Sequence, residues 1–345
     1  MATIFELVTA EAINAYWTQK VTSLPPYLGE ELFPDQKKLG LDIKWIKGAK
    51  GLPVVLAPSA YDVKARKRPR IGFEKLQAQM PFFKEGNGID EELRQQLNMV
   101  LETGNQAYID SVMQRVFDDE TDLLTGARAQ RERMRMMALT TGAISISANG
   151  QAYDYDYGIP EDHKSEVSTS WSNAAADIYG DIEKCLDKVE EDTGVRPTRA
   201  ICSQKTWGYF RKNTNIRNAI LGNNSAVQVS DEKIHSYFLD ELNIDIQKYT
   251  KKYKTEAGVE TAFVADDIFV MFPSGALGTG WFGTTPEESD LMSGTAANVS
   301  ITDTGVAITT VKETDPVNVN TKASMIYLPS FEQADEVYIL DVIAT

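Results

Sequence analysis

The fold of this chain is indicated most clearly by the stretch NAAADIYGDIEKCLDKVEEDTGVRPTRAICSQKTWGYF, residues 173–210. A helix is expected over residues 173–193, and Gly194 is suited to end it, because glycine tolerates the left-handed conformation that follows many helices. Residues 197–202 then predict entry into a buried strand. Ser203 is suited to cap a further helix, because its hydroxyl can accept a hydrogen bond from a free backbone N–H. The stretch therefore predicts a helix–strand–helix unit in a protein of the α+β class.

A long helix is expected before this unit. Apolar residues between 89 and 139 recur close to the 3.6-residue period of an α-helix. Gly104 and Gly126 could kink or divide it, so the pattern predicts either one helix or two in line. Gly142 is suited to stop the helix, and the segment AISIS that follows predicts a strand.

The part of the chain before the long helix predicts little burial on itself. Residues 1–40 hold a short amphipathic stretch and the Pro25-Pro26 break, and they indicate an arm with few ways to bury itself against its own chain. Residues 41–86 have short β-prone pieces, four prolines and no helical period. They predict a long β-hairpin that extends from the main body and carries a basic run in its middle.

The region after residue 213 mixes helix and strand. A helix is expected near 231–242, and a glycine-rich loop near 278–283. The expected strands cover residues 244–253, 261–264, 268–272, 324–329 and 337–343. The last two of these strands would close the fold.

Composition narrows the class of protein. The 345 residues carry 50 acidic and 35 basic side chains, a net charge of −15, and 42% of them are hydrophobic, as in a folded soluble protein. Such an acidic surface repels phosphate backbones and disfavours general nucleic-acid binding, although it does not prevent a protein from enclosing DNA. No apolar run approaches the roughly 18 residues that span a bilayer, and no secretory signal is expected. The two cysteines predict reduced structural thiols.

Gly278, Gly280 and Gly283 fit the GxGxxG pattern of dinucleotide-binding proteins, and an apolar strand precedes them. In those proteins the pattern forms a tight turn from strand into helix that holds a pyrophosphate. Five residues separate strand and motif here, and no helical run follows Trp281 and Phe282, so a nucleotide-binding enzyme is the weaker interpretation. A glycine-rich loop whose two aromatic side chains contact another subunit is preferred.

Other candidate sites for chemistry are weak. The acidic run 118–122 lacks the alternating oxygen ligands and the central glycine of a calcium loop, and it is expected to form a solvated or partner-facing helix surface. His163 and His235, the only histidines, lie in no motif that pairs a histidine with a nucleophile or a metal. No catalytic residue, cofactor or metal is therefore expected.

Charge points instead to contacts between copies of the chain. A basic run on an acidic chain could bind nucleic acid or form a solvated loop, but docking on an acidic surface of another copy fits better. The predicted contact residues are basic side chains of the hairpin, acidic side chains of the long helix and the two late aromatic residues. They are Lys64, Arg66, Lys67, Arg68, Arg70, Asp118, Asp119, Glu120, Asp122, Trp281 and Phe282.

The order of these parts resembles the HK97-like capsid fold of tailed bacteriophages, and more closely the lambda-type major capsid protein family, phage capsid family E. The segments that carry the resemblance are spread over most of the chain and are specific only in combination. They are Gln130-Arg131-Glu132 to Leu139-Thr140-Thr141-Gly142, Val195 to Ser203 with Trp207 and Phe210, Phe282-Gly283 to Glu287, Leu328-Pro329-Ser330 and Asp335-Glu336-Val337. No catalytic signature is among them.

The resemblance implies a particular division of the chain. Residues 1–40 would be the N-terminal arm and residues 41–86 the extended E-loop. The P-domain, which includes the spine helix, would consist of residues 87–213 and 311–345. Residues 214–310 would be the A-domain.

The resemblance also implies a function. Copies would assemble as hexamers and pentamers into an icosahedral shell that encloses double-stranded DNA without sequence-specific binding. Scaffolding, portal and decoration proteins would be separate partners, and no cofactor, membrane or enzymatic activity would be involved. The protein would be located in the virion after assembly in the host cytoplasm. The alternatives are a compartment shell of the encapsulin type, a tail-tube protein, which the long helix disfavours, and a nucleotide-binding α/β enzyme.

Overall fold

The computed structural model describes residues 7–47, 74–89, 106–148, 150–222, 228–292, 297–314 and 317–344, together with Glu91, Gln95, Asn98, Met99 and Glu102. The chain divides into two compact units, each built from segments that lie far apart in the sequence. Unit 1 consists of Met1–Ile43, Gln77–Met134 and Thr279–Ser330, and unit 2 consists of Lys44–Leu76, Arg135–Gly278 and Phe331–Thr345.

Unit 1 is built on a mixed β-sheet. The strand order is β1-β13-β16-β15-β14. β13 pairs with residues 327–330 of β16, and β4 pairs with residues 319–326 of the same strand. All of these pairs are antiparallel except β1 with β13. The strands are β1 (Asp35–Lys37), β4 (Phe82–Ile89), β13 (Thr279–Phe282), β14 (Asn298–Thr302), β15 (Val306–Thr314) and β16 (Val317–Ser330), and a short π-helix, η2 (Glu287–Leu291), follows β13.

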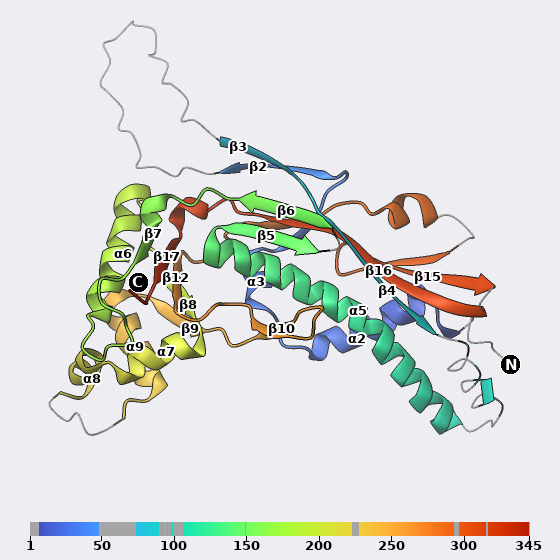
Figure 1. The fold of residues 1–345 in the computed structure, drawn as a ribbon, viewed down its shortest axis with the longest axis horizontal. Helices are drawn as coiled ribbons and strands as arrows, with labels where there is room; N and C mark the ends of the chain where they lie inside the picture. Colours follow the sequence, from blue (N-terminus) through green and yellow to red (C-terminus); the bar gives the residue numbers. More distant parts are fainter. Residues whose placement is uncertain are drawn as a thin grey trace, which may run out of the picture. The chain divides into compact units, whose positions relative to one another are not determined.

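The long helix α5 (Gln106–Thr141) is continuous through Gly126, as Figure 1 shows, which confirms a single helix for this part of the prediction. Gly142 ends it as expected, with a φ of +75° and an N–H that donates to the Ala138 carbonyl at 3.0 Å. β5 (Ala143–Ala148) follows and pairs with β6 (Gln151–Asp156). No described helix, α5 included, combines the length and apolarity that crossing a bilayer requires.

The N-terminal arm is packed on its own chain, so the expectation that it has few ways to bury itself is wrong. Its helices are α2 (Ala10–Ser23) and α3 (Leu28–Leu32). Ile13 and Trp17 of α2 are fully buried, and the Asn14 side-chain amide donates to the Ser300 hydroxyl of β14 at 2.9 Å. The sequence could not show this, because the surface that receives α2 lies nearly 300 residues further along the chain.

Unit 2 is built on a second mixed sheet with the strand order β7-β17-β12-β8-β9. Figure 1 shows the helices α6 to α9 gathered about this sheet. A core of aromatic side chains, in which Phe210 contacts Trp171, Trp207, Phe238 and Phe269, fills the space between helices and sheet. The strands are β7 (Lys164–Glu166), β8 (Arg199–Cys202), β9 (Asp245–Lys248), β12 (Ile268–Phe272) and β17 (Tyr338–Asp341), and the helices are α6 (Ile178–Thr193), α7 (Gln204–Lys212), α8 (Thr214–Leu221), α9 (Asp231–Leu242) and the 3-10 turns η1 (Glu161–His163) and η3 (Ala334–Glu336).

The predicted helix–strand–helix unit is confirmed at its caps. Gly194 ends α6 in the left-handed conformation, with a φ of +74°. Ser203 caps α7, and its hydroxyl accepts a hydrogen bond from the Thr206 N–H at 3.2 Å. The start of α6 differs, because Asp177 caps the helix five residues later than the sequence predicts. Capping residues therefore predicted these helix boundaries more accurately than the spacing of apolar residues did.

The two strands that would form the base of the expected E-loop are present and paired with each other: β2 (Asp42–Lys47) and β3 (Glu74–Gln79). The rest of that hairpin, including the basic run 64–70, lies outside the described residues. A separate two-stranded hairpin consists of β10 (Lys252–Lys254) and β11 (Glu260–Ala262).

The two compact units do not test the expected division into arm, E-loop, P-domain and A-domain, which stays a prediction. β8, which belongs to the stretch 173–210, pairs with β9 and β12 in the sheet of unit 2. β13, β14 and part of β15 belong to the sheet of unit 1. Non-local strand pairing, which leaves no local sequence signal, decides the make-up of these units.

Candidate functional site

The glycine pattern at 278–283 does not form the expected glycine-rich loop. Most of it is β13, a strand held between β1 and β16. A Cβ atom built on Gly280 would lie 2.5 Å from the Tyr327 hydroxyl, and one built on Gly283 would lie 2.9 Å from the Gly40 carbonyl oxygen. These two glycines permit close packing of neighbouring backbone and side chains, and they do not form the turn from strand into helix that a dinucleotide requires.

Phe282 is fully buried, so the prediction that it contacts another subunit is wrong for this conformation. Its ring packs against Tyr327, with the centroids 5.0 Å apart, and the Arg131 guanidinium lies 5.3 Å from its centroid. Trp281 points to the opposite face, because side chains alternate along a strand. It is partly exposed, the Lys38 ammonium lies 5.8 Å from its ring, and its role in a contact stays a prediction.

The acidic run on α5 is not uniformly exposed. Asp118 forms an ion pair with Lys20 at 2.9 Å, and this partner holds the pKa of Asp118 below its usual value. Glu120 is only 2% exposed, so its assignment to a partner-facing surface is wrong. The helical period turns Glu120 toward the interior of unit 1 and leaves Asp119 and Asp122 exposed.

Glu120 should make the stability of the protein depend on pH. Burial raises its pKa from 4.5 to about 7, the Thr321 side chain lowers it by a smaller amount, and Asp119 adds a further small increase. Because the folded state then holds the proton more tightly than the unfolded state, the contribution of Glu120 to stability is greatest below pH 4.5 and falls as the pH rises toward 7. The loss levels off above pH 7 at up to about 3 kcal/mol.

Glu120→Gln should remove this dependence, since the amide carries no charge at any pH. The variant should match the wild type at pH 4.5 and exceed it at pH 8, by up to about 3 kcal/mol in free energy of unfolding. Urea denaturation of the unassembled protein across this range measures the difference. Asp122→Asn, an exposed change on the same helix, is the control. An identical pH profile for wild type and Glu120→Gln would contradict the assignment.

Two buried arginines of α5 hold the arm in place. Arg128 forms a bidentate ion pair with Glu30, in which Nε donates to Oε1 at 2.7 Å and Nη2 donates to Oε2 at 3.0 Å. Arg131 bridges two carboxylates, Asp35 at 3.2 Å and Asp303 at 2.8 Å. These groups line a cavity of about 250 Å³ in unit 1. The contacts join the arm, the long helix and the sheet.

Asp303 connects three elements of unit 1. One carboxylate oxygen accepts the Arg131 hydrogen bond, and the other accepts the Trp17 N–H at 3.0 Å. Asp303 and Thr304 both have positive φ values, 44° and 71°, in the turn between β14 and β15. Non-glycine residues rarely adopt this conformation, so the surrounding contacts hold the turn against some strain.

No role for these arginines was predicted from the sequence. Their signal is spacing, because Leu124, Arg128 and Arg131 lie four and three residues apart and therefore share one helix face. A buried leucine on that face indicates that the arginines beside it are buried too, and a buried arginine requires a carboxylate partner. The identity of the partners could not be predicted, since Asp303 lies 172 residues from Arg131.

In unit 2, His163 lies between two acidic side chains, Asp162 and Asp192. Its Nε2 lies 3.0 Å from Asp192, and Asp162 completes a group whose ligand atoms lie within 4.8 Å of one another. The Lys188 ammonium already occupies the space between the carboxylates, at 2.7 Å from Asp162 and 2.6 Å from Asp192. The cluster is therefore an ion-pair network that a lysine neutralises.

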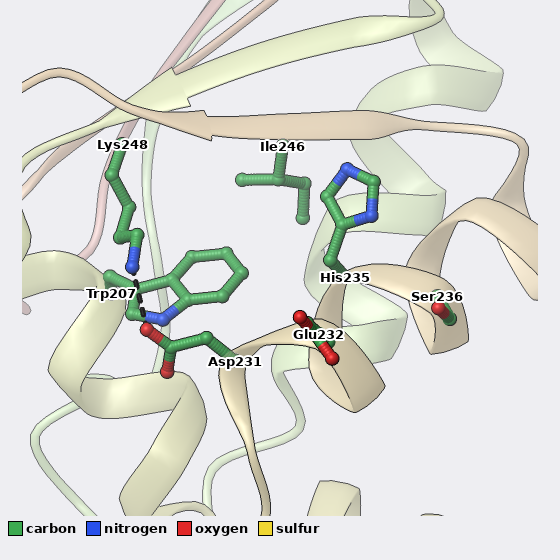
Figure 2. A pocket seen from close by; sticks show the side chains of 7 residues that line it. All are labelled: Trp207, Asp231, Glu232, His235, Ser236, Ile246 and Lys248. Atoms are coloured by element: carbon green, nitrogen blue, oxygen red, sulfur yellow. Dashed lines mark hydrogen bonds and ion pairs between the residues drawn. The ribbon is translucent and has the colours of Figure 1, made fainter.

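The pocket in Figure 2 lies between α7, α9 and β9 and has a volume of about 480 Å³. Three of the ionic side chains that line it, Asp231, His235 and Lys248, pair with one another or with a neighbour. Lys248 contacts Asp231 at 2.6 Å and lies over the Trp207 ring, while the His235 Nε2 contacts Asp245 at 2.7 Å. Figure 2 shows Ser236 apart from the imidazole of the preceding histidine, so the two do not form a nucleophile and base.

Both cysteines of unit 2, Cys185 and Cys202, are buried and free. Burial raises the pKa of each thiol to about 12. Because the thiolate is the reactive form, both groups are chemically quiet at neutral pH. This agrees with the prediction of reduced structural thiols.

Comparison with known structures identifies the fold. A protein from a prophage of Escherichia coli CFT073, assigned as a capsid protein, superposes with a TM-score of 0.63 at 14% identity over 97% of this chain and 99% of that chain. A phage-related protein of Bordetella bronchiseptica RB50 gives 0.53 at 12% identity over 97% of both chains, and the cyanophage A-1(L) capsid protein gives 0.51 at 11% over 92% of both. The chain has the HK97-like fold of viral shell subunits.

The amino-acid sequence also identifies the family to which the chain belongs. Residues 9–342 match the family described as phage major capsid protein E, and the chain belongs to that family. No curated protein matches it. Because the match covers almost the whole chain, the protein is a capsid shell protein and a component of a virion.

Proposed function

We propose that copies of this chain form hexamers and pentamers that close into an icosahedral shell around double-stranded DNA. The observation that carries the proposal is the family match over residues 9–342 together with the shared fold. In this proposal residues 1–40 are the N-terminal arm, and residues 41–86 are the E-loop with β2 and β3 at its base. Residues 87–213 and 311–345 are the P-domain with the spine helix, and residues 214–310 are the A-domain. The net charge of −15 favours a wall that does not bind the DNA it encloses.

Shell formation is the whole activity in this proposal, with no catalytic step. Scaffolding, portal and decoration functions belong to separate proteins, and assembly takes place in the host cytoplasm. Electron microscopy of the expressed protein should show angular hollow shells or rings of subunits. A solution of single molecules that forms neither at any concentration would contradict the proposal. A compartment shell would give similar particles, but its gene would lie beside cargo enzymes rather than terminase and portal genes.

The basic run of the E-loop supplies one contact of this shell in the proposal. Arg66, Lys67 and Arg68 dock on the exposed acidic surface of α5 in a neighbouring copy, where Asp119 and Asp122 provide the charge. Asp118 contributes less, because its own Lys20 already neutralises it. Patches of opposite sign on one chain favour such a head-to-tail contact.

Reversal of the three basic residues to glutamate should block assembly while the single chain stays folded. Size-exclusion chromatography measures assembly, and circular dichroism measures folding. Further reversal of Asp119 and Asp122 to lysine in the same chain should restore assembly, because the patches are again opposite in sign. The control reverses the exposed Lys212, Lys233 and Lys254, which gives the same net charge. Normal shells from the first variant, or equal loss in the control, would contradict the docking contact.

A further inference from the structure

Three large apolar side chains are exposed near the base of the E-loop in unit 1. Leu39 is 86% exposed, Leu41 is 47% exposed and Phe82 is 39% exposed. Single exposed apolar residues are common on protein surfaces, but a cluster of them marks a surface that contacts something else. These three residues are called the Leu39 patch below.

Leu39 and Leu41 lie in the segment between β1 and β2, and Phe82 is the first residue of β4. The Met80 N–H donates to the Leu41 carbonyl at 2.9 Å. Phe82 follows two residues later and pairs with Ile326 of β16. A Cβ atom built on Gly283 would lie within 3.0 Å of the Gly40 carbonyl oxygen, of the Met80 side chain and of the Ile326 side chain. Both segments therefore meet over Gly283, the residue that follows β13.

The exposure of Leu39 comes from a fixed backbone. Gly40 has a φ of +97°, a conformation that other residues rarely adopt. The absence of a side chain on Gly283 lets the Gly40 carbonyl approach the sheet. Ile43 and Met80, which flank the patch, are buried. The segment is anchored on both sides, and the Leu39 side chain between these anchors is 86% exposed.

The charge around the patch differs from that of the whole chain. Its neighbours in sequence are the acidic Asp42 and Glu85 and the basic Lys38, Lys44 and Lys84. The chain as a whole carries −15, so copies repel one another on average. A surface that is apolar and not acidic is where two copies can meet without that repulsion.

We infer that the Leu39 patch is a docking site for a second copy of the chain, and that its burial between subunits stabilises the shell. The inference rests on the proposed shell function, in which the most abundant neighbour of each subunit is another copy. Burial of apolar area drives association of this kind, and Leu39, at 86% exposed, has most of its surface left to bury.

Leu39→Ser tests the patch directly. The single chain should keep its fold, because Leu39 contributes little to burial within it. The protein concentration needed for assembly, measured by light scattering, should rise roughly tenfold, and further in Leu39→Ser with Leu41→Ser. The matched control is Val259→Ser, which removes a 59%-exposed apolar side chain from unit 2. Assembly of the double variant at the wild-type concentration would overturn the inference.

Leu39→Cys gives a second readout that does not depend on an assembly defect. The introduced thiol should react quickly with a maleimide in the unassembled chain and at least about tenfold more slowly in the shell, while Cys185 and Cys202 contribute little background. Equal labelling in both forms would overturn the inference and leave the shell function intact. If the wild type itself forms no rings or shells, the proposed function fails first, and the inference falls with it.

Discussion

Arg131→Ala should lower the free energy of unfolding by about 3–5 kcal/mol, because it leaves two carboxylates of unit 1 without their cation. The Arg131 side chain is 5% exposed, and those of Asp35 and Asp303 are 19% and 18% exposed, so water can replace little of the lost interaction. The change also removes the guanidinium that lies over the Phe282 ring. Urea denaturation of the unassembled protein measures the loss.

The control for this prediction is Arg115→Ala on the same helix. Arg115 is exposed, so its removal should change stability by no more than about 0.5 kcal/mol. Arg131→Lys should fall between the two, because an ammonium keeps the charge but cannot direct separate N–H groups at both carboxylates. If Arg131→Ala and Arg115→Ala unfold at the same urea concentration, the bridge does not stabilise the fold.

Trp17→Ala should destabilise the protein by a similar amount, about 3–5 kcal/mol, because it empties a fully buried indole site beneath the arm. Trp17→Phe keeps most of the apolar contact and loses the N–H that Asp303 accepts, so it should cost about 1–2 kcal/mol. Gln19→Ala, an exposed change on the same helix, is the control. Urea denaturation followed by far-ultraviolet circular dichroism measures the free energy of unfolding of all three variants, because this signal comes from the backbone and does not depend on Trp17.

A double variant links the two predictions. Trp17 and Arg131 donate to different oxygens of the same Asp303 carboxylate, so their contributions should not be independent. The coupling energy of Trp17→Phe with Arg131→Ala should be about 0.5–3 kcal/mol. Strict additivity would mean that Asp303 does not connect the arm to the long helix.

The elements that the sequence predicted well are those with local causes. Ser203 and Gly194 were assigned correctly as caps, because a cap depends on hydrogen bonds within three or four residues. The stop of the long helix at Gly142 follows the same rule. The capsid function was also predictable, since the order of arm, hairpin, long helix and α/β body resembles the family whose match covers residues 9–342.

The errors concern residues whose surroundings come from distant parts of the chain. Phe282 and Glu120 were expected on the surface. The Tyr327 ring packs against Phe282, and the Thr321 side chain contacts Glu120, and both of these residues belong to β16. The arm was expected to be free, but its docking partner Asp303 lies 286 residues beyond Trp17. Composition and periodicity do not identify partners that lie so far apart in the chain, so the contacts at these positions could not be assigned.

The interleaving of the two units has a consequence for synthesis on the ribosome. β16, which pairs with β4, β13 and β15, is complete only when residue 330 has been added, and β17, which joins β7 to β12, is complete only at residue 341. Neither sheet can be completed while the nascent chain is shorter than that. A polypeptide released early by premature termination would therefore have gaps in the centre of its sheets, and it would be a target for degradation rather than a competitor for positions in the shell.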